Sequence, residues 1–161
     1  MNKLIYISLA LYILDILSSC SPEPQWKASL YLKNCIADSI YIETNISTCD
    51  STYPYSNAGN KFILAPGELV VIAQSKHHYN ESNPIITIEQ LVDNYEGAYV
   101  TISVKLSDKQ VSKTWEYSNR NNGSKQLFNL NDSKLESSKD GHKAFETYQY
   151  YFMITENLLV E

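Results

Sequence analysis

The side chains best suited to metal chemistry are three histidines, two of which are adjacent in the sequence. His77 and His78 lie shortly before Glu81, and this grouping raises the question of a zinc site. Neighbouring residues of a strand point to opposite faces, however, and zinc needs three or four protein ligands, for which only His142 is left among the histidines. The pair therefore predicts a solvated loop, and we expect no metal and no cofactor.

Motifs that organise catalysis are missing from the sequence. It has no G-x-S-x-G nucleophile elbow, no H-E-x-x-H pair and no glycine-rich phosphate loop, and it contains only five glycines. No motif brings a nucleophile, a base and an oxyanion site together. We therefore expect a protein that is not an enzyme, with a hydrolytic enzyme as the least favoured alternative.

The charge balance argues against nucleic acid as a partner. The chain has a formal net charge of −5, and Arg120 is its single arginine. Binding of nucleic acid depends on lysines and arginines that neutralise phosphates. We expect no nucleic-acid partner.

The first twenty residues have the pattern of an export signal. Lys3 supplies a positive charge, and residues 4–14 (LIYISLALYIL) form an apolar run that is shorter than the roughly 20 residues that span a bilayer. Residues 17–20 (LSSC) then resemble the lipobox of bacterial lipoproteins, in which the cysteine is acylated before cleavage. Asp15 departs from this pattern, so cleavage at another site or an uncleaved anchor are the alternatives.

The lipobox resemblance implies a cellular location for the protein. Residues 1–19 would be a lipoprotein signal peptide, and acylated Cys20 would hold the mature chain on the lipid bilayer of the bacterial outer membrane. Residues 20–27 are interpreted as a lipidated tether, because Pro22 and Pro24 disfavour both helix and sheet. Glu23 is a single acid where Bacteroidetes lipoproteins carry an acidic surface-export signal, so the periplasmic and the surface-exposed side both stay open.

Cys35 and Cys49 form a candidate disulfide. Outside the cytoplasm a cysteine pair is more often bridged than free. If residues 29–35 and 38–45 form a hairpin, however, Cys35 lies near the turn and Cys49 lies beyond the opposite end of the second strand, and a bridge requires Cα atoms within about 7 Å. The two arguments oppose each other, and bridged and free cysteines remain equal alternatives.

Period-two alternation dominates the rest of the chain and predicts strands with one buried face. In residues 98–106 it assigns Val100, Ile102, Val104 and Leu106 to the core. Between two shorter runs, Pro66-Gly67 predicts a type II turn, which splays hairpin strands and marks a corner where the chain changes sheets. One short helix is expected over residues 87–95. The predicted strands cover residues 29–33, 38–45, 62–64, 69–74, 98–106 and 145–155.

Asn122-Gly123 predicts a further hairpin within residues 113–132, because both residues tolerate positive φ in a type I′ turn. This register makes cross-strand neighbours of four large side chains, for which we expect burial. Residues 133–142 are polar and predict a loop. The four side chains are Trp115, Tyr117, Phe128 and Leu130.

Short strands without long alternating helices predict an all-β fold, an antiparallel β-sandwich with one short helix, formed as a single domain by residues 28–161. An immunoglobulin-like strand order is left open. The layout of lipobox, early DSIYI strand (residues 38–42), PGE turn (66–68) and aromatic last strand resembles the small uncharacterised lipoproteins of gut Bacteroidetes. That resemblance implies location and carries no active residues.

Thirteen tyrosines are the compositional oddity of the chain. Tyrosine favours strands, but its ring also offers rigid contact area with a polar group for sugars or protein partners. Tyr41, Tyr99 and Tyr151 alternate with core residues and form the candidate binding face. We expect a non-catalytic binding or adhesion module for an envelope protein or glycan, with an immunity-type or accessory lipoprotein that has a constitutive protein partner as the alternative.

Overall fold

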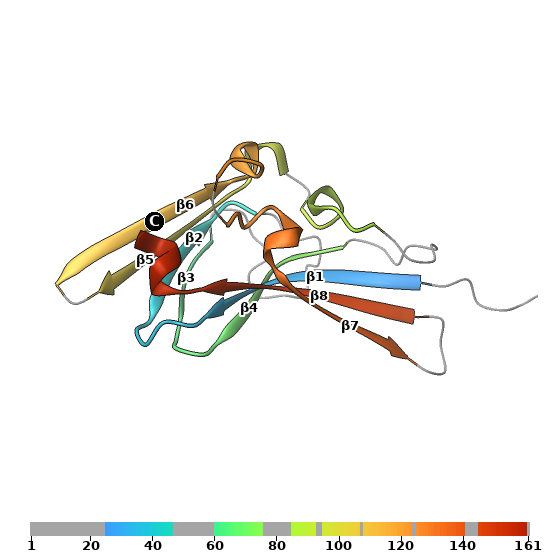
Figure 1. Cartoon of the computed structure of the whole chain (residues 1–161), viewed down its shortest axis with the longest axis horizontal. Coiled ribbons are helices and arrows are strands. Elements are labelled where there is room, and N and C mark those ends of the chain that lie inside the picture. The colour runs from blue at the N-terminus through green and yellow to red at the C-terminus, as the bar shows by residue number, and fades with distance from the viewer. Residues whose placement is uncertain are drawn as a thin grey trace, which may run out of the picture.

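The computed structural model describes residues 25–46, 60–75, 85–92, 95–106, 108–123, 125–140 and 145–160. In this part of the chain eight strands form two packed four-stranded sheets, with the order β4-β1-β8-β7 in sheet A and β3-β2-β5-β6 in sheet B (Figure 1). The strands are β1 (Gln25–Asn34), β2 (Ile40–Thr44), β3 (Asn60–Leu64), β4 (Leu69–Gln74), β5 (Tyr99–Leu106), β6 (Lys109–Glu116), β7 (Lys134–Asp140) and β8 (Phe145–Ile154).

The predicted all-β sandwich is confirmed, with one pairing that the sequence did not indicate. β1 and β8, the first and last strands, run parallel at the centre of sheet A, and the other strand pairs are antiparallel. This parallel pair distinguishes the strand order from that of an immunoglobulin domain, in which both sheets are antiparallel. β1 begins at Gln25, so the last three residues assigned to the tether belong to the sheet.

The core lies between the two sheets and is filled by the inward residues of each strand. Along β5, Val100, Ile102 and Val104 are almost fully buried and Leu106 packs at the margin, as predicted. Along β8, Phe152 and Ile154 have no exposed surface. Two tryptophans, one from each sheet, and the apolar residues of β1 complete the same cluster: Trp26, Trp115, Ala28, Leu30 and Leu32.

The predicted corner at Pro66-Gly67 is confirmed. β3 ends in sheet B and β4 begins in sheet A, and the turn between them closes with a hydrogen bond from the Glu68 N–H to the Ala65 carbonyl (3.1 Å). Gly67 has φ of 78°, a conformation that glycine adopts without the Cβ clash of other residues. The turn therefore transfers the chain from one layer of the sandwich to the other.

Buried Asn34, at the end of β1, holds this corner against the crossing from β1 to β2. Its amide nitrogen donates to the carbonyls of Asp38 (2.9 Å) and Leu64 (3.0 Å), and its Oδ1 accepts from the Ile36 N–H (2.9 Å). β1 and β2 lie in different sheets, so residues 29–45 do not form a hairpin. One amide side chain thus satisfies three backbone groups at the point where both crossings meet.

The predicted hairpin at Asn122-Gly123 is wrong. β6 ends at Glu116 and pairs with β5 over eight residue pairs, from Tyr99↔Glu116 to Leu106↔Lys109. A 3₁₀ turn, η3 (Tyr117–Asn119), follows, and the chain then returns as a loop with a second 3₁₀ turn, η4 (Leu130–Asp132). The four large side chains assigned to that hairpin are nevertheless buried, as expected, because this loop packs Phe128 and Leu130 onto the core.

Two further elements differ from their predictions. Residues 134–140, expected as polar loop, form strand β7 at the edge of sheet A, where its described side chains are exposed and carry no apolar alternation. The expected helix at residues 87–95 is reduced to the 3₁₀ turns η1 (Ile88–Gln90) and η2 (Tyr95–Gly97), although the Thr87 N–H does donate to Gln90 Oε1 (2.9 Å). α2 (Glu156–Val160) ends the described chain.

α2 packs on the core through Leu158 and Leu159 and is linked to sheet B by Lys113. Lys113 points inward from β6, and its Nζ donates to the carbonyl of Leu158 (2.7 Å) while lying 5.6 Å from the centroid of the Trp115 ring. In the ranges that the structure describes, no helix has both the length and the apolar character needed to cross a membrane.

Candidate functional site

Several predicted site residues lie outside the described residues. These are Cys20, Cys49 and the three histidines His77, His78 and His142. Cys35 is described and exposed, with its Sγ 3.8 Å from the Sδ of Met153, whereas its predicted partner Cys49 is not described. The disulfide therefore stays a prediction.

Tyr151, one of three tyrosines assigned to the binding face, lies on the outer surface of sheet A. Its ring stacks on that of Tyr31 from neighbouring β1, with 5.0 Å between ring centroids and 20° between planes. The Tyr151 hydroxyl donates to Gln149 Oε1 (3.0 Å), whose amide donates to the Tyr31 hydroxyl (3.3 Å). This tyrosine is thus held against its own sheet, away from the other two.

Tyr41 and Tyr99 lie on the outer surface of sheet B. Alternation along β2 and β5 buries Ile42, Val100 and Ile102 and leaves the residues between them facing outward. Tyr41 is paired with Ser103, four residues along β5 from Tyr99, a separation of about 14 Å in an antiparallel strand. The sheet therefore places the two rings on one surface but not in contact.

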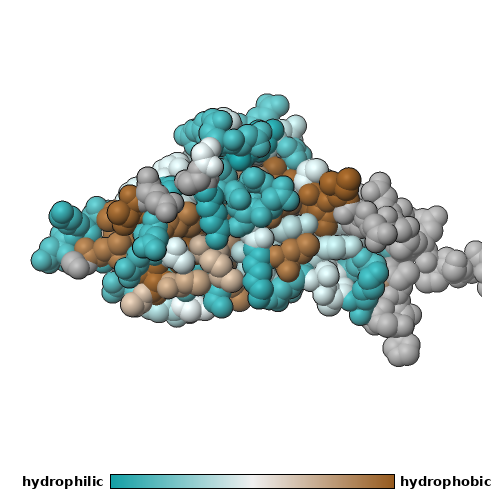
Figure 2. All heavy atoms as spheres, viewed as in Figure 1, coloured by the Kyte–Doolittle hydropathy of each residue, from teal (hydrophilic) through white to brown (hydrophobic). Residues whose placement is uncertain are grey.

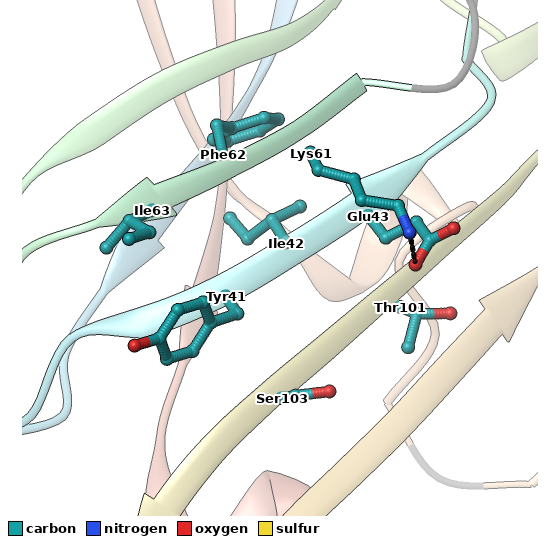
Figure 3. A pocket seen from close by; sticks show the side chains of 8 residues that line it. All are labelled: Tyr41, Ile42, Glu43, Lys61, Phe62, Ile63, Thr101 and Ser103. Carbon is teal, nitrogen blue, oxygen red and sulfur yellow. Dashed lines mark ion pairs between the residues drawn. The ribbon is translucent and has the colours of Figure 1, made fainter.

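Tyr41 has an apolar neighbour that sequence reasoning missed. Ile63, on edge strand β3, is directly opposite Tyr41 in the register, and both side chains are 58% exposed. Figure 3 shows the two side chains next to each other on adjacent strands. Both line a shallow depression of about 230 Å³. Two large side chains that folding leaves in water thus lie at one place on the sheet.

The floor beside Tyr41 consists of short hydroxyl side chains. On β5 and β6, Ser103 Oγ and Ser112 Oγ are 2.9 Å apart, and Thr101 Oγ1 and Thr114 Oγ1 are 2.8 Å apart. Both pairs are cross-strand partners on the outer surface. We name the surface formed by Tyr41, Ile63, Thr101, Ser103, Ser112 and Thr114 the Tyr41 face.

Charged residues of both signs line the depressions beside Tyr41. Lys61 Nζ lies 3.2 Å from Glu43 Oε2, and both side chains are well exposed, so the pair adds little to stability. On the other side of Tyr41, Lys105 lines the neighbouring depressions together with Asp108 and Asp38, so the acidic residues are in excess. The face itself presents an aromatic ring, an aliphatic side chain and uncharged hydroxyls.

Figure 2 shows hydrophobic residues in separate patches among hydrophilic ones on the visible side of the molecule. A broad apolar surface of the kind found in obligate interfaces is not seen in that view. Exposed large hydrophobic side chains, among the described residues, include Tyr41, Ile63, Leu69, Ile85, Leu135 and Val160, and of these Tyr41 and Ile63 are direct cross-strand partners.

A second polar cluster joins the η1 turn to the η3 turn. The Tyr117 hydroxyl donates to the carboxylate of Glu89, and the Arg120 guanidinium carbon lies 3.9 Å from the centroid of the Tyr117 ring. Burial and the hydrogen bond to Glu89 raise the pKa of Tyr117 to about 12. Burial acts to raise the pKa of Glu89, but the Tyr117 hydrogen bond and the nearby Arg120 charge contribute to a net lowering.

This cluster has a structural explanation. Tyr117 is buried against Tyr95 and Phe128, and its hydroxyl and the single arginine close the end of the sandwich over the core. A tyrosine that stays protonated to about pH 12 does not act as a base near neutral pH. The cluster therefore forms a hydrogen-bonded cap over the core.

No group of three or more histidine, cysteine, aspartate or glutamate side chains with metal-binding geometry occurs among the residues that the structure describes. In comparisons with known proteins, no family model, curated protein or solved structure matches the chain.

The hydroxyl floor could be predicted from the sequence only if the pairing of β5 with β6 was known. Thr101 and Ser103 alternate with core residues, and so do Ser112 and Thr114, but the signal that joins the two strands is the two-residue loop at positions 107–108. That loop reads Ser-Asp and lacks the Asn-Gly or Asp-Gly sequence typical of type I′ hairpins. Ile63 was missed because β3 is a five-residue edge strand.

Proposed function

We propose that this protein is a lipid-anchored, non-catalytic binding module of the bacterial outer membrane that presents the Tyr41 face to an envelope protein or glycan. One observation carries the binding role: Tyr41 and Ile63 are cross-strand partners, and each is 58% exposed on the outer surface of sheet B.

Physical chemistry favours a ligand at this position. Folding buries apolar side chains where it can, and two large ones side by side in water mark an interaction site more often than isolated ones do. Tyrosine contributes a large rigid area at a small cost in conformational entropy and is enriched in binding surfaces. The depression beside the ring gives a ligand contact from two directions.

The location rests on the sequence. The apolar run at residues 4–14 and the lipobox at residues 17–20 support acylation of Cys20, and several acyl chains would hold the domain on the outer membrane. β1 begins five residues after Cys20, so the tether would be short and the domain would lie close to the bilayer.

The binding role is tested by capture with matched surface variants. Full-length protein, purified in mild detergent, is immobilised and exposed to solubilised native envelope, which contains both proteins and glycans. We expect the wild type to retain a specific component and the variant Tyr41→Ala with Ile63→Ser to retain at least tenfold less.

Tyr151→Ala is the control, because it removes an equally large ring from the outer surface of the other sheet. It should retain the component at the wild-type level. Equal retention by the wild type, the double variant and the control would refute a binding role for the Tyr41 face.

A further inference from the structure

We infer that the Tyr41 face binds a neutral oligosaccharide; this inference deepens the binding role proposed above and rests on it. Three properties of the face identify the ligand class: free hydrogen-bonding capacity, an exposed ring, and the absence of excess positive charge among the described residues around it.

The hydroxyl floor has unused hydrogen-bonding capacity of both kinds. Two hydroxyls together hold two donors and four lone pairs, and one bond between them uses one of each. The pairs Thr101–Thr114 and Ser103–Ser112 each make one such bond, which leaves one O–H donor and about three acceptor positions per pair. Sugar hydroxyls both donate and accept, and so they match a floor of this composition.

The ring of Tyr41 supplies the apolar half of the contact. A pyranose presents a face of C–H groups that packs on an aromatic ring, whose hydroxyl can bond to the sugar edge. Tyr41 is 58% exposed and lies beside Ser103, so a sugar on the ring would reach the floor with its own hydroxyls. The exposed Ile63 on the other side of the ring extends the apolar contact.

A protein partner fits the same face less well. Hot spots of protein interfaces are rich in tryptophan, tyrosine and arginine, and serine and threonine are under-represented in them. Four of the six side chains of the Tyr41 face are serine or threonine, and its neighbours include no arginine, since Arg120 lies at the cluster with Tyr117. One tyrosine on a hydroxyl floor is therefore a poor protein anchor.

The charged residues around the Tyr41 face favour neutral sugars over acidic ones. Lys61 is paired with Glu43, and Lys105 lies with Asp108 at the next depression, so each described cation near the ring has an acidic residue close by. An acidic glycan would need a basic group that is free to pair with its carboxylate or sulfate. The face thus favours uncharged sugars.

The test measures binding of the full-length chain in detergent to immobilised oligosaccharides. The probes are neutral gluco-, manno-, galacto- and xylo-oligosaccharides, with sialylated and uronic-acid oligosaccharides of similar length alongside. We expect binding to at least one neutral series and at least tenfold weaker binding to the acidic ones. Tyr41→Ala and Ser112→Val should each weaken it by about tenfold or more, and Tyr151→Ala should leave it unchanged.

A crosslinking experiment distinguishes a failure of the sugar assignment from a failure of the proposed binding role. In parallel, a photo-crosslinking amino acid replaces Ile63, and products in native envelope are compared with and without Tyr41→Ala. No neutral-sugar binding together with a Tyr41-dependent protein crosslink overturns the sugar assignment and keeps the binding role. No sugar binding and no Tyr41-dependent product overturns both. Preference for acidic sugars, or neutral-sugar binding that survives Tyr41→Ala, also overturns the inference.

Discussion

Asn34 offers the sharpest test of how the sandwich is held together. Its amide makes three hydrogen bonds to backbone groups and has no exposed surface. In the variant Asn34→Ala, the carbonyl of Asp38 can turn to water because that residue is exposed, but the Ile36 N–H and the Leu64 carbonyl are left buried without this partner.

Each buried backbone group left unsatisfied costs about 1–3 kcal/mol, so the two groups left by Asn34→Ala should lower the free energy of unfolding by about 2–6 kcal/mol. For a domain of this size, each kcal/mol corresponds to roughly 3–4 °C in Tm. We therefore expect a fall in Tm of roughly 6–24 °C. Asn119→Ala is the control, since this exposed side chain makes a single hydrogen bond to Glu116, and it should change stability by less than about 0.5 kcal/mol.

The variant Asn34→Asp adds a signature in pH. The introduced carboxylate would face the two carbonyl oxygens that now accept from the Asn34 amide, so its folded-state pKa should lie above its usual value. A raised folded-state pKa gives stability that is present below the unfolded-state pKa of about 4 and is lost as pH rises through the folded-state pKa.

Thermal unfolding of the full-length chain in detergent, followed by circular dichroism between pH 3 and 8, checks both variants. The deficit of Asn34→Asp relative to the wild type should be smallest near pH 3 and should exceed that of Asn34→Ala at pH 7. A deficit of Asn34→Ala below about 1 kcal/mol, or a deficit of Asn34→Asp that is independent of pH, would refute the role of this amide.

Two further predictions concern the N-terminus and the core cap. Cys20→Ala should move the protein to the aqueous phase of a detergent partition or leave the precursor uncleaved. A variant that is cleaved to the wild-type size and still partitions into the detergent phase would rule out acylation at this residue. Tyr117 has a folded-state pKa of about 12 against an ordinary value of 10, so its contribution to stability is present below pH 10 and is lost between pH 10 and 12. Tyr117→Phe should make the fall of Tm over that interval shallower than in the wild type and in the exposed-tyrosine control Tyr41→Phe, and equal slopes in all three would contradict the assignment.

The alternation of core residues in β5 and β8 could be predicted from the sequence because both strands lie in the interior of their sheets. In each strand one face meets the core and the other meets water or small polar neighbours, and this environment imposes period two. The corner at Pro66-Gly67 could be predicted because it depends on local residues alone: the turn itself sets the φ of Gly67. Features governed by one strand or one turn were thus predictable.

Features governed by long-range pairing were not. Gly123 does adopt a positive φ of 80°, as a tight turn requires, but the chain around it does not pair as strands. β6 is already paired with β5, and the segment after Gly123 is held instead by Trp115 Nε1 donating to the Lys125 carbonyl (3.3 Å) and by Asp132 accepting from the Gln126 N–H (2.8 Å). A strong local turn signal was therefore correct about the turn and wrong about what it connects.

The Tyr41 face depends on pairing in the same way. Its side chains come from four strands, and a slip of one residue between β5 and β6 would turn Ser112 and Thr114 inward and Lys113 and Trp115 outward. Burial of Trp115 thus fixes the register that brings four hydroxyls together on the outside. Burial constrains the inward residues of this sheet more tightly than the outward ones, which are freer to follow the chemistry of a ligand. An exposed ring beside an uncharged hydroxyl floor is therefore the part of the protein where function should be sought first.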